Sequence, residues 1–271
     1  MSVVRLGAVS YLNARPLVYG LETDARFDVR YDIPSECARL LHAHQTDLGL
    51  IPSIEYLRGP GSYAIVPGPA ITSNGPVASV AIYTRREARD IRTIAMDTSS
   101  RSSVALAAIV LRRFFRVSAE PVPMAPDLDT MLRSADAALI IGDRALFLDH
   151  ASAAVRKLDL GEIWTRETGL PFVYACWTGW PQAVTEEGVD ALLRARDEGV
   201  AHADDVAKAF FPGDPARQIA ASRYLRDNIR YVLGDDELEG LRTFYKYAAE
   251  LGLVSSAGPL NFYHVAHDRA R

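Results

Sequence analysis

The sequence predicts an α/β protein made of two lobes, joined by a hinge that the chain crosses twice, with a ligand cleft between them. Strand and helix patterns alternate through the first two thirds of the 271 residues, which favours a parallel or mixed sheet with crossover helices. Polar clusters follow several apolar strands directly, and ligands of open α/β sheets bind beyond the carboxyl ends of strands. The predicted lobes are 1–84 with 178–271, and 85–177.

The first predicted element is an apolar strand that ends at Val9 and runs into a polar cluster. Its apolar positions are typical of a strand covered on both faces. The side chains that follow are candidate binding groups, namely Ser10, Tyr11, Asn13 and Arg15. In the alternative interpretation, the serine and the asparagine cap a helix and the tyrosine packs in the core.

An edge strand over 29–33, a helix from Pro34 and a buried strand over 47–51 are expected next. Ser35 is available as the cap of that helix. Ser53 follows the buried strand, where it can cap the next helix and also faces the sheet end of the first polar cluster. We therefore take Ser53 as a further candidate site residue.

A long apolar strand is predicted over 77–83, after Gly75 and Pro76, and it is interrupted by Ser79. A buried hydroxyl without a partner costs about 1 to 3 kcal/mol, so Ser79 either bonds neighbouring backbone or faces a pocket. We favour the pocket. The remaining strands are expected over 91–96, 121–123, 137–141 and 171–177, followed by helices that begin near Thr185, Pro215 and Asp235.

Five hydroxyl residues lie within the six positions 98–103, between an apolar strand and a helical run over 104–115. Unpaired backbone N–H groups at a helix start, surrounded by hydroxyl donors, bind a carboxylate or phosphate. The alternative is a serine-rich cap and loop. The candidate binding residues here are Thr98, Ser99, Ser100, Arg101, Ser102 and Ser103.

Two further segments are expected to line the cleft. Gly142 and Asp143 follow a predicted strand, and the glycine allows a ligand to approach the backbone closely. Asp143 can instead serve only as a helix cap. Pro171 and Phe172 lie where the chain returns to the first lobe. A two-lobed fold brings these strand ends together across one cleft.

Composition and charge argue against several classes of protein. No apolar run approaches the ~20 residues that span a bilayer, so we expect no membrane partner. A net charge of -4 gives no overall attraction to nucleic acid. The N-terminus lacks a secretory pattern, so we expect a cytoplasmic protein if Met1 is the true start. The sequence leaves the oligomeric state open.

Cysteines and histidines do not indicate a metal site. Cys37 and Cys176 have apolar neighbours and are interpreted as packing residues, with a disulfide as the alternative. The histidine pairs lack the spacing and acidic neighbours of metal ligands, so surface histidines are expected. These pairs are His42 with His44 and His264 with His267.

Common cofactor and nucleophile motifs are absent from the sequence. It contains no GxxxxGK phosphate loop, no GxGxxG, no CxxC pair and no GxSxG elbow, so no cofactor is expected. The candidate cleft also lacks an obvious histidine or glutamate base. This favours either pure binding or a reaction in which the substrate supplies its own proton acceptor.

Five segments occur in an informative order: VSYLNARPL at 9–17, DLGLIPS at 47–53, SSRSS at 99–103, IGD at 141–143 and TGLPF at 168–172. Together they resemble the chorismate dehydratases of the futalosine route to menaquinone. The resemblance extends from about residue 5 to 177. Ser102 stands where threonine is common in that family, and the hydroxyl is retained.

The resemblance implies a type II periplasmic-binding-protein-like fold recast as a cytoplasmic enzyme. It also implies dehydration of chorismate to 3-[(1-carboxyvinyl)oxy]benzoate, without a cofactor. On this hypothesis, Asn13 and Ser79 are catalytic and orient the reacting groups, while groups from 99–103 hold a substrate carboxylate. Closure of the lobes excludes water, and the enolpyruvyl carboxylate acts as the internal base.

Two alternatives come from different classes. The sister enzyme of the same route makes 1,4-dihydroxy-6-naphthoate, and we expect a histidine near its cleft, whereas no histidine here falls in a motif. A non-catalytic binding protein is the other alternative. A solute receptor needs a signal or lipid anchor, and a regulator needs a DNA-binding helix pair, neither of which is visible in the sequence.

Overall fold

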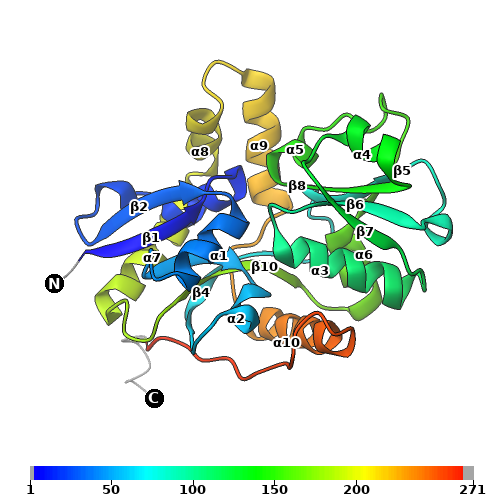
Figure 1. The fold of residues 1–271 in the computed structure, drawn as a ribbon. Helices are drawn as coiled ribbons and strands as arrows, with labels where there is room; N and C mark the ends of the chain where they lie inside the picture. The colour runs from blue at the N-terminus through cyan, green and yellow to red at the C-terminus, as the bar shows by residue number, and fades with distance from the viewer. Residues whose placement is uncertain (1–2, 265–271) are drawn as a thin grey trace.

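The structure, a computed structural model, describes residues 3–264 and consists of two α/β lobes side by side (Figure 1). Each lobe contains one five-stranded mixed sheet. The strand order is β2-β1-β3-β10-β4 in the first sheet and β7-β6-β8-β5-β9 in the second. The predicted α/β class with two lobes is confirmed.

The first sheet combines early strands with one late strand. β1 is parallel to β2 and β3, whereas β10 is antiparallel to β3 and β4. Both β3 and β10 are buried along their whole length, as expected for strands covered on both faces. The strands are β1 (Val4–Val9), β2 (Phe27–Asp32), β3 (Leu48–Pro52), β4 (Ala64–Ser73) and β10 (Phe172–Gly179).

The second sheet repeats this mixed arrangement. β6 is parallel to β7 and β8, and β5 is antiparallel to β8 and β9. The strands are β5 (Val80–Thr84), β6 (Thr93–Asp97), β7 (Glu120–Met124), β8 (Ala137–Ile141) and β9 (Arg156–Asp159). β9 is not among the predicted strands, because this short edge strand carries charged residues and no apolar run.

Two strands next to the expected lobe boundaries at 84 and 177 pair in the other lobe than expected. β5 is expected in the first lobe but pairs with β8 and β9, and β10 is expected in the second but pairs with β3 and β4. The strand expected over 77–83 begins only at Val80, as β5, because Ala78 with a φ of +62° is outside the extended conformation. The lobes as separate domains stay a prediction.

Helices cover the sheets on both faces (Figure 1). In the first lobe these are η1 (Leu12–Val18), η2 (Leu21–Thr23), α1 (Pro34–His42), α2 (Glu55–Arg58), α7 (Glu186–Ala201), α8 (Ala203–Phe210), α9 (Pro215–Asp227) and α10 (Asp235–Glu250). In the second they are η3 (Ala88–Asp90), α3 (Arg101–Ile109), the π-helical η4 (Val110–Phe114), α4 (Leu128–Ser134), α5 (Gly142–Leu146) and α6 (Leu160–Thr168).

The three expected C-terminal helices correspond to α7, α9 and α10, and Thr185 caps α7 through its side chain. The sequence analysis misses α8, which follows α7 after a single residue. The expected cap of α1 is wrong: Ile33 occupies the N-cap and no side chain caps the helix, because Pro34 is already its first residue and places Ser35 inside it.

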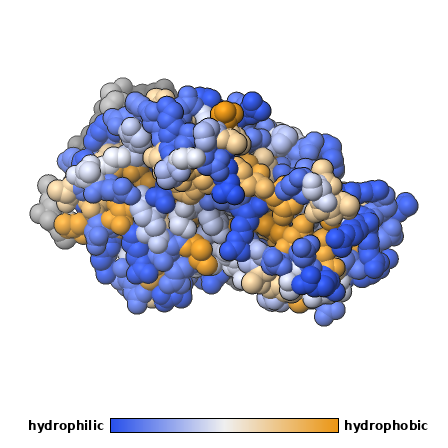
Figure 2. All heavy atoms as spheres, turned by 90° about the horizontal axis from the view of Figure 1, so that it is seen from above, coloured by the Kyte–Doolittle hydropathy of each residue, from blue (hydrophilic) through white to orange (hydrophobic). Residues whose placement is uncertain are grey.

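One apolar core runs through both lobes, and a smaller cluster lies behind the second sheet. Cys37 and Cys176 are free and buried, which confirms their interpretation as packing residues. Figure 2 shows hydrophilic residues over most of the upper face, with apolar residues visible in the hollows between them. Within residues 3–264, no helix is long and apolar enough to cross a membrane.

Candidate active site between the lobes

A small cavity of about 40 Å³ lies between the lobes, where strand ends of both sheets meet. Six of the predicted site residues line it: Tyr11, Asn13, Ser79, Ser100, Ser103 and Gly142. They come from the ends of β1, β6 and β8 and from the crossing before β5. The expectation that separate strand ends converge on one cleft therefore holds for these six residues.

Asn13 and Ser79 share a buried tyrosine that the sequence analysis misses. The Ser79 Oγ lies 2.7 Å from the hydroxyl of Tyr224 on α9. Burial raises the pKa of Tyr224, while its interactions with Ser79 and the Asn13 amide oppose that rise. No sequence motif surrounds Tyr224, and a buried aromatic on a helix is usually core, so only the fold could reveal it.

Asn13 Oδ1 is buried and has no hydrogen-bond partner among residues 3–264. Because the side chain lines the cavity, this oxygen is available to accept a hydrogen bond from a ligand. Ser79, in contrast, is satisfied by Tyr224. If the tyrosine donates this bond, the serine hydrogen is free to point into the cavity.

The start of α3 forms one wall of the cavity. Ser100 is the N-cap, and its Oγ accepts from the Ser103 backbone N–H at 3.5 Å and lies 3.1 Å from Ser103 Oγ. Both serines line the cavity. The cap and the cavity-lining roles considered for this cluster thus coexist at Ser100, and the free N–H groups of the helix start favour an anion nearby.

Tyr11 and Gly142 touch each other across the lobes. A Cβ at Gly142 would lie 2.8 Å from the Tyr11 ring, and its φ of +64° also favours glycine. The Tyr11 hydroxyl donates to Ser99 Oγ at 3.0 Å. Ser99 also bonds Asp97, so this predicted binding residue closes the lobes instead of lining the cavity.

Asp143 makes a second contact across the lobes, since its carboxylate accepts from the Leu12 backbone N–H at 3.1 Å. Burial raises the pKa of Asp143 to about 6, although the Leu12 bond and the charge of Arg15 lower it. The expected cap role is wrong, because Ile141 is the N-cap of α5 and Asp143 lies inside the helix.

Arg15 points away from the cavity. Positions two apart on a short helix face different directions, so Arg15 and Asn13 diverge on η1. The Arg15 guanidinium lies 4.0 Å from the Tyr31 ring centre, in a separate hollow at the surface of the first lobe. As a cavity residue, Arg15 is not supported.

Four more predicted residues lie outside the cavity lining. Ser10 accepts from Arg15 only through its backbone carbonyl, at 3.5 Å, and Thr98 is exposed. Phe172 is fully buried against Trp164, and the Pro171 carbonyl accepts from the indole of that tryptophan. Tyr174, two residues further along the same face of β10, lines the cavity instead.

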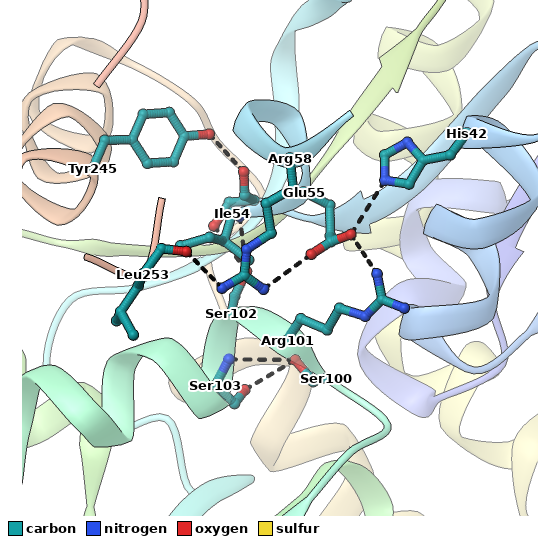
Figure 3. A network of polar contacts seen from close by, with 11 residues as sticks. His42, Ile54, Glu55, Arg58, Ser100, Arg101, Ser102, Ser103, Tyr245 and Leu253 are labelled. Atoms are coloured by element: carbon teal, nitrogen blue, oxygen red, sulfur yellow. Dashed lines mark hydrogen bonds and ion pairs between the residues drawn. The ribbon is translucent and has the colours of Figure 1, made fainter. Parts of the chain in front are cut away.

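Ser53, Arg101 and Ser102 make polar contacts beside the cavity, and Figure 3 shows those of Arg101 and Ser102. Ser53 Oγ donates to the Val173 carbonyl at 2.7 Å, so the Ser102 hydroxyl, 3.1 Å away, donates to Ser53. Arg101 binds the buried carboxylate of Glu55. These three predicted binding residues thus contact neighbouring protein groups outside the cavity lining.

Glu55 and His42 are functional candidates that the sequence analysis misses or misplaces. His42 is expected at the surface, but its ring bonds Tyr63 at 2.6 Å and Glu55 at 3.2 Å. His44 stacks on Trp180, whereas His267 lies outside the described residues. Residues 3–264 contain no group of three or more potential metal ligands.

The crossing before β5 is held by two residues of β9. Asp159 accepts from the backbone N–H groups of Val77 and Ala78, at 3.1 and 2.7 Å. Lys157 Nζ donates to the Ala78 carbonyl at 2.6 Å. Ala78 has a φ of +62°, an uncommon conformation for a residue with a side chain. These bonds fix the backbone that presents Ser79 to the cavity.

The family model for menaquinone biosynthesis matches residues 4–250. The chain belongs to this menaquinone biosynthesis family. It is also 30% identical to the chorismate dehydratase of Thermus thermophilus over 265 residues, covering 92% of this chain and 95% of that protein. The family resemblance of the five sequence motifs is therefore confirmed across nearly the whole chain.

Solved structures of distantly similar proteins share the fold. A protein of Archaeoglobus fulgidus has a TM-score of 0.73 at 17% identity, covering 93% of this chain and 98% of its own. A Candida albicans protein described as having the generic periplasmic binding protein fold has a TM-score of 0.67 at 10% identity, with 99% and 100% covered. The menaquinone family member thus has the predicted periplasmic-binding-protein-like fold.

Proposed function

We propose that this menaquinone-family protein dehydrates chorismate to 3-[(1-carboxyvinyl)oxy]benzoate in the cavity between its lobes. The observation that carries the proposal is the similarity to the Thermus chorismate dehydratase along 92% of the chain. The geometry agrees with it, since an unpaired amide oxygen, hydroxyls and a helix start surround one enclosed space. The naphthoate synthase alternative is not favoured, and no histidine of residues 3–264 lines the cavity.

The reaction requires loss of one proton and one hydroxide. The C–H bond breaks at the ring carbon that bears the enolpyruvyl ether, and its electron pair becomes part of the aromatic ring. The neighbouring C–O bond breaks at the same time or afterwards, and proton and hydroxide leave as water. Aromatisation supplies much of the driving force, so the protein mainly needs to orient the groups.

Asn13 and Ser79 are proposed to orient the leaving hydroxyl. The unpaired Asn13 Oδ1 accepts its hydrogen bond, and the Ser79 hydroxyl, oriented by Tyr224, donates to the departing oxygen. Ser100, Ser103 and the free N–H groups of α3 bind a substrate carboxylate. No histidine or acidic side chain lines the cavity within the described chain, so the enolpyruvyl carboxylate is the proposed internal base.

The test is incubation of the purified protein with chorismate, followed by mass spectrometry and ultraviolet absorption. We expect an aromatic product lighter than chorismate by one water, formed without added metal or cofactor. Unchanged chorismate at high protein concentration contradicts the proposal. The cytoplasmic location and the lack of a nucleic-acid partner stay predictions of the sequence.

A further inference from the structure

We propose that Glu55 is a positioning residue for the reaction proposed above, which fastens the start of α3 to the first lobe through Arg101. The inference rests on the proposed function for its effect on substrate. Its structural part concerns a contact between the lobes that can be measured without substrate. Glu55 does not line the cavity, so any effect on catalysis passes through other residues.

The Glu55 carboxylate is fully buried and has two arginines and a histidine ring around it (Figure 3). Arg101 donates to Oε2 at 2.6 Å, Arg58 donates to Oε1 at 3.2 Å, and the His42 ring lies 3.2 Å from Oε2. Burial alone would raise the pKa of Glu55, but the bonds to His42 and Arg101 lower it below its ordinary value. The carboxylate is therefore ionised and available to hold an arginine.

The three partners of Glu55 come from different lobes. His42 on α1 and Arg58 on α2 belong to the same lobe as Glu55, and Arg58 also donates to the Leu253 carbonyl at 3.0 Å. Arg101, the first residue of α3, belongs to the other lobe. When the lobes separate, the buried carboxylate keeps two partners and loses one. The Glu55–Arg101 contact can therefore break and form again without leaving the carboxylate buried and unpaired.

The residues beside Arg101 extend this contact along the start of α3. Ser102 Oγ accepts from the Ile54 backbone N–H at 3.1 Å, and the Ser99 carbonyl accepts from the Ser35 N–H at 2.9 Å. Ser100 and Ser103, in the same turn, line the cavity. The bonds that join this turn to the first lobe thus determine the position of the two serines, Ser100 and Ser103, that are proposed to bind a carboxylate.

The experiment compares Glu55→Gln with Arg58→Gln. Both substitutions remove a charge from the same cluster, but only the first removes the group that holds Arg101. Hydrogen exchange of the amides at 99–103 is measured without substrate, and kcat and KM are measured with chorismate. We expect faster exchange and a KM raised about tenfold in Glu55→Gln, the size of a lost charged hydrogen bond. In Arg58→Gln the exchange rate and the KM are expected to stay within about twofold of wild type.

Arg101→Gln provides the second variant, because Arg101 is 41% exposed and its substitution leaves the core intact. Its amide exchange and its KM are expected to match those of Glu55→Gln. The KM of the double variant is expected to be no higher than that of either single variant. Equal exchange in the Glu55 and Arg58 variants, or a KM unchanged in Glu55→Gln, overturns the inference. If wild type does not consume chorismate, the proposed function fails. The exchange experiment still tests whether Glu55 holds the start of α3 through Arg101.

Discussion

At the scale of single residues, Asn13 differs from the other polar side chains that line the cavity because its Oδ1 is buried without a partner. Its place after β1 makes it a candidate from sequence alone. The same argument favours Arg15, which turns out to stack on Tyr31 outside the cavity. Sequence locates the strand end, but the direction of each side chain depends on the tight geometry of η1.

Asn13→Ala is expected to leave the free energy of unfolding within about 1 kcal/mol of wild type, or to raise it, because the substitution removes an unsatisfied buried oxygen. Turnover of chorismate is expected to fall about 100-fold. Urea denaturation and a rate assay measure the two effects. Asn228→Ala is the control, since its amide donates to Pro76 O at 3.0 Å, and its loss lowers stability.

The raised pKa of Asp143 predicts how the free energy of unfolding depends on pH. Burial raises its pKa in the folded protein to about 6, above the value of about 4 in an unfolded chain. Its stabilising contribution is thus complete below about pH 4 and is lost as pH rises through about 6. Compared with Asp143→Asn, wild type loses roughly 3 kcal/mol of unfolding free energy across this window.

Urea denaturation of both proteins at several pH values between about 4 and 7 measures this difference. Asparagine keeps an oxygen that accepts from the Leu12 N–H, so the comparison isolates the ionisation of Asp143. A difference between the two proteins that stays constant across this range, or that grows in favour of wild type, contradicts the assignment.

At the scale of elements, the apolar strands and the polar residues that follow them could be predicted, because burial on both faces leaves a clear pattern. The sequence could not predict to which of the two sheets β5 and β10 belong. Each is apolar enough for either lobe, and only pairing with specific neighbours decides. The role of α9 was also hidden, since Tyr224 reaches Ser79 from 145 positions away in the chain.

Gly142, at the start of α5, is expected to be needed for the lobes to close. In Gly142→Ala the new methyl group meets the Tyr11 ring at 2.8 Å, in addition to the strain of a positive φ. Gly169→Ala carries similar strain at φ +74° but has open space around it. Gly169→Ala is expected to lose about 1 kcal/mol of stability and to keep its turnover, whereas Gly142→Ala is expected to lose more stability and most of its turnover.

Tyr224→Phe tests whether α9 orients Ser79. The substitution removes the hydroxyl that lies 2.7 Å from Ser79 Oγ, so kcat is expected to fall about tenfold with KM little changed. Tyr231→Phe is the matched control, because the Tyr231 hydroxyl is buried without a partner among the described residues. If both variants retain full kcat, Tyr224 does not orient the reacting groups.

At the scale of the whole molecule, the two lobes lie against each other around a cavity of about 40 Å³. A space of this size holds roughly three water molecules, so a ring-shaped substrate enters only when the lobes separate. Contacts such as Tyr11 to Ser99 and Asp143 to Leu12 join the lobes around it. The motifs predicted two lobes and a cleft, but these contacts involve residues far apart in sequence and required the fold.

The central claim is that this cavity dehydrates chorismate, and wild type and Asn13→Ala compared side by side test it most directly. Each protein is mixed in excess with chorismate, and the loss of one water is followed by mass spectrometry, with thermal unfolding as the measure of binding. We predict that chorismate raises the melting temperature of both proteins, whereas only wild type rapidly forms the aromatic product. Equal rates of product formation in the two proteins would contradict the account.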